Sequence, residues 1–159
     1  MSKPKSLSFR IDYNFKTRVI NTKATLFAVS APSPNKVVTI NAIWDTGATD
    51  SVITPDVSKY LQLFAIDTVS IQGVNSEGIA PISIVHIGLP NNVLITSKRV
   101  SIARIGGGAD MLIGMDIISL GDMIICNGDN KTSFSFVIPS FPDKPDWIEK
   151  SNQINNLSV

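Results

Sequence analysis

Cysteine and histidine occur once each in the 159-residue sequence, as Cys126 and His86. A single cysteine cannot form a disulfide bond within the chain, and such cysteine usage is typical of a reducing compartment. A metal site would have to consist entirely of carboxylates, because the other common ligands are so scarce, and the sequence contains no such cluster. We therefore predict no metal site and no cofactor.

Charge and long apolar runs are also scarce. Charged residues make up 17% of the chain and nearly cancel to a net charge of +1, which gives no electrostatic basis for binding nucleic acid. No apolar run approaches the roughly 20 residues needed to cross a bilayer, and the N-terminal sequence MSKPKSLSFR lacks the apolar core of a secretion signal. We expect a cytoplasmic protein with neither a nucleic-acid partner nor a membrane partner.

Hydrophobic residues, in contrast, make up 43% of the chain, which indicates a folded protein rather than a disordered one. The length suits one domain with a substantial core, and no break in composition divides it. We predict an N-terminal strand or leader over residues 1–16, one domain over residues 17–140, and a polar tail over residues 141–159. Several prolines interrupt the tail, so we expect it to be loosely held beyond Trp147.

Alternating apolar and polar residues predict strands along most of the chain. Residues 7–15 are apolar at every second position, which gives a strand with one face to bury. The β-branched runs 18–29 and 36–44 are separated by a turn sequence and predict two antiparallel strands. Further strands are predicted at residues 68–74, 79–89, 92–105, 111–114, 122–126 and 132–138.

Two short segments have a helical pattern instead. Thr54 can cap a helix, Pro55 suits the first helical position, and apolar side chains then recur three and four residues apart up to Leu61. Residues 115–120 form a second segment, which Gly121 stops. The sequence therefore predicts a mainly β domain with two short helices.

The stretch AIWDTGATDSVITP, residues 42–55, leads an apolar strand directly into the carboxylate of Asp45. A carboxylate near buried backbone costs free energy unless a partner compensates it. Two carboxylates a hydrogen bond apart can share one proton, so that one takes a proton from water while the other donates to a peptide carbonyl. Gly47 allows close approach of the backbone, and Thr46 offers a hydroxyl for a buried contact.

The run IWDTGA at residues 43–48, followed by MLIG at residues 111–114, resembles the catalytic signature of the retropepsin-like aspartic proteases. The resemblance also includes the helix after the first motif and a hairpin in the position of the family's mobile flap. It implies an all-β, retropepsin-like acid protease fold. That fold is a closed, barrel-like domain with one or two short helices, and it forms a homodimer.

The sequence contains one Asp-Thr-Gly motif, whereas a two-lobed, pepsin-like monomer would need two. The second carboxylate must then come from another copy of the chain. The resemblance implies an aspartic endopeptidase that is an obligate homodimer, with Asp45, Thr46 and Gly47 of each subunit as its catalytic residues. By position in the family, the N-terminal strand and the Phe134–Ile138 strand are expected at the interface.

A peptide or protein substrate is expected to lie extended between the catalytic turn and the hairpin, whose polar tip NSEG covers residues 75–78. About six to eight substrate residues would bind there, partly by strand addition. The residues expected to contact substrate are Ala48, Asp50, Gly73, Val74, Asn75, Ser76, Glu77, Gly78 and Ile79. Two of them, Val74 and Ile79, indicate a preference for apolar side chains at the cut.

Three positions depart from common family patterns. Retroviral members often have an acid two residues after the first glycine and an arginine after the second motif, and this ion pair braces the dimer. The corresponding residues here are Thr49 and Met115, so the bracing must differ. Ala48 lacks the hydroxyl that stabilises the ionised pair in relatives with serine, so we expect a less acidic pH optimum than that of pepsin-like enzymes.

Other interpretations use the same residues. Asp45 could cap a turn, and a retropepsin-fold dimer could bind or scaffold peptides without cutting them. His86 lacks the Gly-x-Ser-x-Gly context of a serine hydrolase, and the glycines at 106–108 lack the pattern of a nucleotide-binding loop. We interpret Asp110 and Asp116 as turn and helix-start residues rather than as a second catalytic acid.

Overall fold

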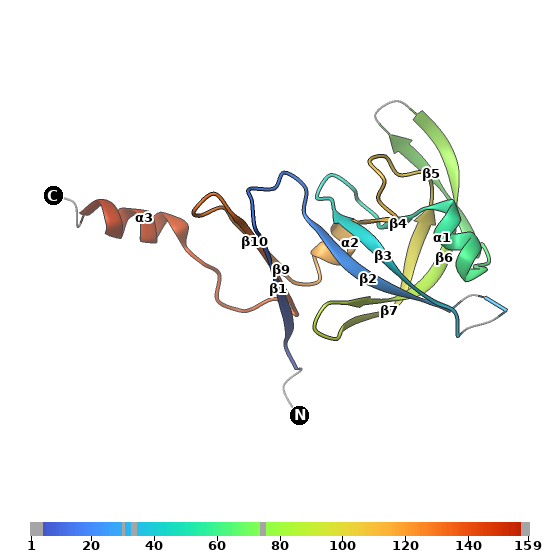
Figure 1. The fold of residues 1–159 in the computed structure, drawn as a ribbon, viewed down its shortest axis with the longest axis horizontal. Coiled ribbons are helices and arrows are strands. Elements are labelled where there is room, and N and C mark those ends of the chain that lie inside the picture. The colour runs from blue at the N-terminus through green and yellow to red at the C-terminus, as the bar shows by residue number, and fades with distance from the viewer. Residues whose placement is uncertain (1–4, 30, 33–34, 74–75, 157–159) are drawn as a thin grey trace.

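The structure is a computed structural model that describes residues 5–29, 31–32, 35–73 and 76–156. The described residues form ten strands and three helices (Figure 1). Along the chain these are β1 (Leu7–Tyr13), β2 (Asn21–Ala28), β3 (Val37–Trp44), β4 (Val52–Ile53), α1 (Pro55–Leu61), β5 (Asp67–Gly73), β6 (Ser76–Leu89), β7 (Val93–Ile102), β8 (Met111–Ile113), α2 (Met115–Ile118), β9 (Asp122–Cys126), β10 (Thr132–Ile138) and α3 (Trp147–Asn156). The fold is therefore mainly β, as the alternating sequence predicts.

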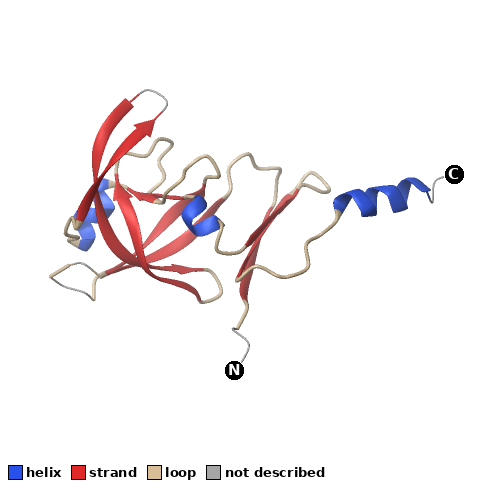
Figure 2. Ribbon diagram, turned by 180° about the vertical axis from the view of Figure 1, so that it is seen from behind, coloured by secondary structure: helices blue, strands red, loops and turns tan. Residues whose placement is uncertain are grey.

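Six of the strands close into a barrel. Their order is β2-β3-β8-β4-β7-β6, and an additional pairing of β2 with β6 joins the two ends of the sheet. Strand β5 extends this sheet beyond β6, so that the β5–β6 hairpin stands out from the barrel (Figure 2). Fully buried aliphatic side chains form the core, among them Leu26, Ile53, Val85, Ile87, Met111 and Ile113.

The pair of strands before the Asp-Thr-Gly motif is antiparallel, as predicted. Its register runs from Asn21 opposite Ile43 to Phe27 opposite Val37, and buried and exposed residues alternate along β2. Strand β3 also pairs in parallel with β8, which places Trp44 opposite Ile113. The end of β3, which leads into the Asp-Thr-Gly motif, therefore lies between β2 and β8.

A separate three-stranded sheet has the order β1-β10-β9. Phe9, Phe134 and Phe136 are buried on one of its faces and pack around Trp44, whose ring centroid lies 4.9 Å from those of Phe134 and Phe136. Such tilted aromatic pairs add to the free energy gained by burial. This contact anchors the terminal sheet to the end of β3, next to the motif.

The terminal strands pair within one chain. Strand β1 pairs with β10 from Leu7 opposite Ile138 to Tyr13 opposite Thr132, and β9 occupies the other edge of β10. The Phe134–Ile138 strand, expected at an interface, therefore has no edge left for a partner strand. Within the described residues, the outer edges of this sheet belong to β1 and β9.

The two predicted helices are present. Thr54 caps α1 by accepting a hydrogen bond from the backbone of Val57 at 3.4 Å, and Pro55 occupies its first turn. Helix α2 ends at Ile118, two residues earlier than predicted. A Cβ on Gly121 would overlap the carbonyl of Val137, so this glycine lets the end of the α2 segment pack against β10.

The expectation of at most two helices was wrong, because the tail contains α3. Asp146 Oδ1 accepts hydrogen bonds from the backbones of Ile148 and Glu149, both at 2.9 Å, which caps the helix. None of the residues of α3 is buried, and the helix projects beyond the terminal sheet (Figure 1). Over the described part of the chain, no helix has the length and apolar character needed to span a bilayer.

Candidate active site

Asp45 directly follows the last residue of β3 and is half-buried. Its backbone N–H donates to the carbonyl of Ile113 in β8 at 2.9 Å. Its carbonyl accepts from the N–H of Ala48 at 3.2 Å, and its Oδ1 accepts from the N–H of Gly47 at 2.8 Å. These three hydrogen bonds close a tight turn and fix the direction of the carboxylate.

Gly47 favours a close approach to this carboxylate, and its backbone conformation is an ordinary one. Its φ does not lie in the left-handed region, and a Cβ there would meet Asp45 Oδ1 at 3.1 Å. Thr46 is exposed. Its predicted contact across a dimer interface stays a prediction.

The second glycine motif lies against the Asp-Thr-Gly turn. A Cβ on Gly114 would be 2.7 Å from the carbonyl carbon of Asp50 and 2.9 Å from the carbonyl oxygen of Ala48. The N–H groups of the next two residues, Met115 and Asp116, donate to the carbonyls of Ala48 and Thr49 at 2.8 and 3.0 Å. Backbone hydrogen bonds thus link the two segments that carry Thr49 and Met115, which stand in place of the expected acid and arginine.

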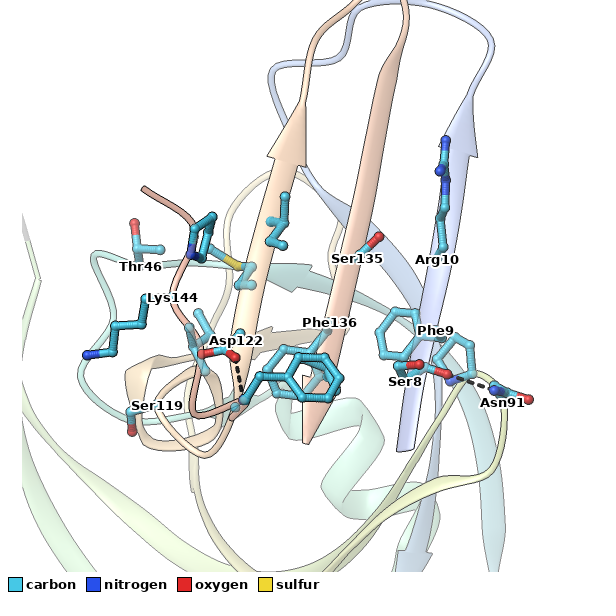
Figure 3. A pocket seen from close by; sticks show the side chains of 18 of the residues that line it. Ser8, Phe9, Arg10, Thr46, Asn91, Ser119, Asp122, Ser135, Phe136 and Lys144 are labelled. Carbon is cyan, nitrogen blue, oxygen red and sulfur yellow. Dashed lines mark hydrogen bonds between the residues drawn. The ribbon is translucent and has the colours of Figure 1, made fainter. Parts of the chain in front are cut away.

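A cavity of about 1370 Å³ opens beside the turn. Thr46 lies at one end of it and Ser8 and Asn91 lie at the other (Figure 3). Its walls come from the α2 region, from the terminal sheet and from the segment after β10, where the N–H of Phe141 donates to Asp122 Oδ2 at 2.8 Å. The cavity therefore connects the Asp-Thr-Gly turn with the β9 side of the terminal sheet.

The β5–β6 hairpin lies at the same end of the barrel as the loop that follows β3 (Figure 1). The predicted tip at residues 75–78 was wrong in part, because strand pairing continues to Gly73 opposite Ser76. Glu77 and Gly78 consequently belong to β6, not to the turn. Of the other expected contact residues, Ile79 is 76% exposed on β6, whereas Val74 and Asn75 lie outside the described residues.

An exposed ion pair connects the base of this hairpin to β7. Arg99 Nη2 lies 2.8 Å from Asp67 Oδ2. The hydrogen bond from Arg99 lowers the pKa of the Asp67 carboxyl, with a smaller contribution from the N–H of Thr68. Both side chains are more than half exposed, so solvent screens the pair and its contribution to stability is small.

Sequence reasoning missed a group of polar side chains behind the turn: Ser51, Lys98 and Asp116. Asp116 does stand at the start of α2, as interpreted, but its carboxylate also contacts Ser51 and Lys98. No local sequence signal marks this group, because Lys98 stands in β7 between two other polar residues. Asp110 also has a structural role, because its carboxylate accepts from the N–H of Asn41 at 2.9 Å.

The chain has a retropepsin-like fold. Its structure matches the crystal structure of a retropepsin-like aspartic protease from Rickettsia conorii with a TM-score of 0.55 and 14% identity, over 87% of this chain and 98% of that one. The EIAV protease complexed with the inhibitor HBY-793 has a TM-score of 0.48 and 22% identity, over 67% of this chain and 89% of that one. The simian foamy virus (mac) protease has a TM-score of 0.42 and 15% identity, over 62% and 91%. No family model and no curated protein matches the sequence.

Proposed function

We propose that the protein is an aspartic endopeptidase, which hydrolyses peptide bonds with a water molecule held between two Asp45 residues, one from each subunit of a homodimer. The observation that carries the proposal is the geometry of Asp45. This half-buried carboxylate sits at the mouth of a retropepsin-like barrel, with its direction fixed by the N–H of Gly47. The fold match to a retropepsin-like aspartic protease supports the same chemistry.

The mechanism follows from two acids that share one proton. The ionised carboxylate accepts a proton from water as the water oxygen attacks the peptide carbonyl, and the neutral carboxyl donates its proton to the carbonyl oxygen. Collapse of the tetrahedral intermediate then breaks the C–N bond as the amine takes up a proton. In this scheme Gly47 orients each carboxylate, and the exposed Thr46 contacts the opposite turn.

The partner is proposed to join through the terminal sheet. Strand β9 has an open edge, and its Ile124 and Ile125 are 41% and 43% exposed. An open edge with apolar side chains favours pairing with another strand. The cavity beside Thr46 borders the same strand, so a copy docked there would face the catalytic turn. Residues 1–16 and 132–138 would support the interface from within each subunit, residues 17–140 would form the protease domain, and residues 141–159 would be a peripheral tail.

The substrate is proposed to be an extended peptide bound between the turn and the hairpin, which acts as a flap. Ala48 and Asp50 would line the floor, and residues 73–79 would cover the peptide by strand addition. The 76% exposed side chain of Ile79 supports a preference for apolar residues at the cut. A dimer that binds peptides without turnover is the competing function, and the following experiment separates the two.

Asp45→Asn should lower the rate of peptide cleavage by about a thousandfold or more, since an amide can neither accept the water proton nor share the acidic one. The measurement is cleavage of a peptide library, with sedimentation to check that the dimer persists. Asp129→Asn, in the exposed turn before β10, is the matched control and should cleave normally. Cleavage that persists in Asp45→Asn contradicts the proposal, and binding without any cleavage by the wild type supports the competing function.

A further inference from the structure

Asp116, in the first turn of α2, contacts two other parts of the chain. Its Oδ2 lies 2.6 Å from Nζ of Lys98 in β7, and its backbone carbonyl accepts from the same Nζ at 3.1 Å. Its Oδ1 accepts from Oγ of Ser51 at 2.7 Å, and its N–H donates to the carbonyl of Thr49 at 3.0 Å. One residue therefore joins α2, β7 and the segment that follows the catalytic turn.

This ion pair is shielded from solvent. The side chains of Lys98 and Asp116 are only 20% and 14% exposed, whereas those of Arg99 and Asp67, a pair formed by the next residue of β7, are 57% and 54% exposed. Charges removed from water are costly unless each is paired and hydrogen-bonded. Loss of either part-buried partner would leave the other without its opposite charge, whereas a member of the exposed pair can exchange its partner for water.

Ser51 transmits this contact to the catalytic turn. It is fully buried, and its Oγ accepts from the N–H of Gly114 at 3.1 Å while donating to Asp116. Gly114 follows Ile113, whose carbonyl holds the N–H of Asp45. A displacement of Asp116 would therefore affect the turn by two routes. It would move Ser51, which contacts Gly114, and it would move the start of α2, which donates to the carbonyls of Ala48 and Thr49.

We propose that Lys98 and Asp116 form a part-buried positioning pair, which holds residues 48–51 and β8 in the arrangement that Asp45 needs. Neither residue touches the reacting atoms in this scheme. Their effect on catalysis rests on the proposed peptidase function, whereas their effect on the position of the turn does not. The exposed Arg99–Asp67 pair has no such role.

The test uses Lys98→Met, Asp116→Asn and the double variant in the full-length chain. Methionine keeps most of the lysine stem, and asparagine keeps an oxygen for Ser51, so each single change chiefly leaves one unpaired charge. We expect each single variant to lower kcat per active site by about 10- to 100-fold, because a small misplacement of catalytic groups has effects of this size. The double variant should lose less than either single one, since no part-buried charge is left unpaired.

Titration of active sites with a statine-type inhibitor makes kcat independent of the fraction of folded enzyme. Arg99→Met, Asp67→Asn and their double variant are the matched controls for the amide-exchange measurement, and each should leave the exchange of the Gly114, Met115 and Asp116 amides unchanged, as expected for a screened surface pair. Unchanged kcat in both single variants of the part-buried pair would overturn the proposal. A double variant as impaired as the singles would also overturn it.

Amide hydrogen exchange provides a readout that does not depend on activity. The amides of Gly114, Met115 and Asp116 should exchange faster in the single variants, while the amide of Phe134 in the terminal sheet should not change. If the wild type has no peptidase activity, the proposed function fails, and the exchange rates still decide whether the pair positions the turn. Unchanged exchange overturns the inference. If a single variant does not fold, a double variant that folds supports the pairing argument, and one that also fails to fold contradicts it.

Discussion

Glycine is required at Gly114 because neighbouring backbone occupies the space of a side chain. The nearest atoms to a Cβ there belong to the backbones of Asp50 and Ala48, which cannot move without carrying the catalytic turn with them. Moving backbone atoms costs more free energy than moving the end of a flexible side chain. The second glycine motif thus sets the distance between β8 and the turn.

Gly114→Ala should destabilise the fold by about 1–3 kcal/mol, as overpacking does in a well-packed region, and should lower peptide cleavage by more than the loss of stability explains. Urea denaturation and cleavage assays on the same preparation measure the two effects. Gly128→Ala is the matched control, because a Cβ at Gly128 meets nothing within 4 Å. Its stability should stay within about 0.5 kcal/mol of the wild type. Equal stability of the two variants would refute this account.

The sequence was informative at the residue scale wherever the chemistry was local. Asp45, Thr46 and Gly47 are consecutive, so their turn could be predicted from residue types alone, and the hydrogen bond from Gly47 to the carboxylate agrees with it. The contact between Ser51 and Asp116 joins residues 65 positions apart. No local pattern encodes such a pair, because the tertiary packing of the chain decides whether the hydroxyl and the carboxylate meet.

At the scale of elements, β1 is fastened to the start of β2 by one side chain. The hydroxyl of Tyr13 donates to the carbonyl of Asn21 at 2.6 Å and accepts from its N–H at 3.1 Å. Partial burial raises the pKa of Tyr13, and the hydrogen bond with Asn21 offsets this only in part. The neutral hydroxyl is therefore favoured by folding.

This pKa shift has a defined consequence for stability. Because the unfolded chain loses the tyrosine proton first, the contribution of Tyr13 is complete below its ordinary pKa of 10.0 and is lost as the pH rises through the higher, folded value. Tyr13→Phe should lower the free energy of unfolding by about 1 kcal/mol at neutral pH. The difference from the wild type should shrink in urea denaturation above pH 10.

Tyr60→Phe is the control for this effect, since the side chain of Tyr60 is 57% exposed. A difference between Tyr13→Phe and the wild type that stays constant with pH would contradict the assignment. Comparison of the two variants separates the contribution of the partly buried Tyr13 hydroxyl from the general effect of alkaline pH on the stability of the protein.

The elements that the sequence predicted well are those in which the alternation of buried and exposed residues continues over many positions. Strands β1, β2, β3 and β10 alternate over seven or eight residues, and the alternation matches their buried faces. Strand β4 has two residues, too few for any period, and it forms because β7 and β8 pair with it from both sides. Helix α3 was missed because its sequence is polar and follows several prolines, so only its capping by Asp146 marks it.

At the scale of the whole molecule, the proposed dimer depends on β9. Ile124→Lys would place a charge on the open edge, and a symmetric interface would meet the change twice. We expect this variant to sediment as a monomer at concentrations where the wild type is a dimer, and to lose cleavage activity in proportion. Leu94→Lys, at a site that is 53% exposed on β7, is the control and should remain dimeric.

The melting temperature of Ile124→Lys should stay within about 4 °C of the wild type under conditions where both are monomeric, because the changed side chain is already partly exposed. A variant that remains fully dimeric and active would exclude β9 from the interface. A variant that unfolds instead would show that Ile124 supports the terminal sheet itself.

The pairing of β1 with β10 inside one chain also bears on how the proposed dimers would exchange subunits. The three strands of each terminal sheet pair within one chain, without strands from a second subunit. The proposed dimers would therefore form from prefolded subunits, and these could exchange without unfolding. If Asp45→Asn chains replaced wild-type chains at a fixed total concentration, activity would then fall with the square of the wild-type fraction. A protein of this architecture would be open to dominant interference by its own inactive copies.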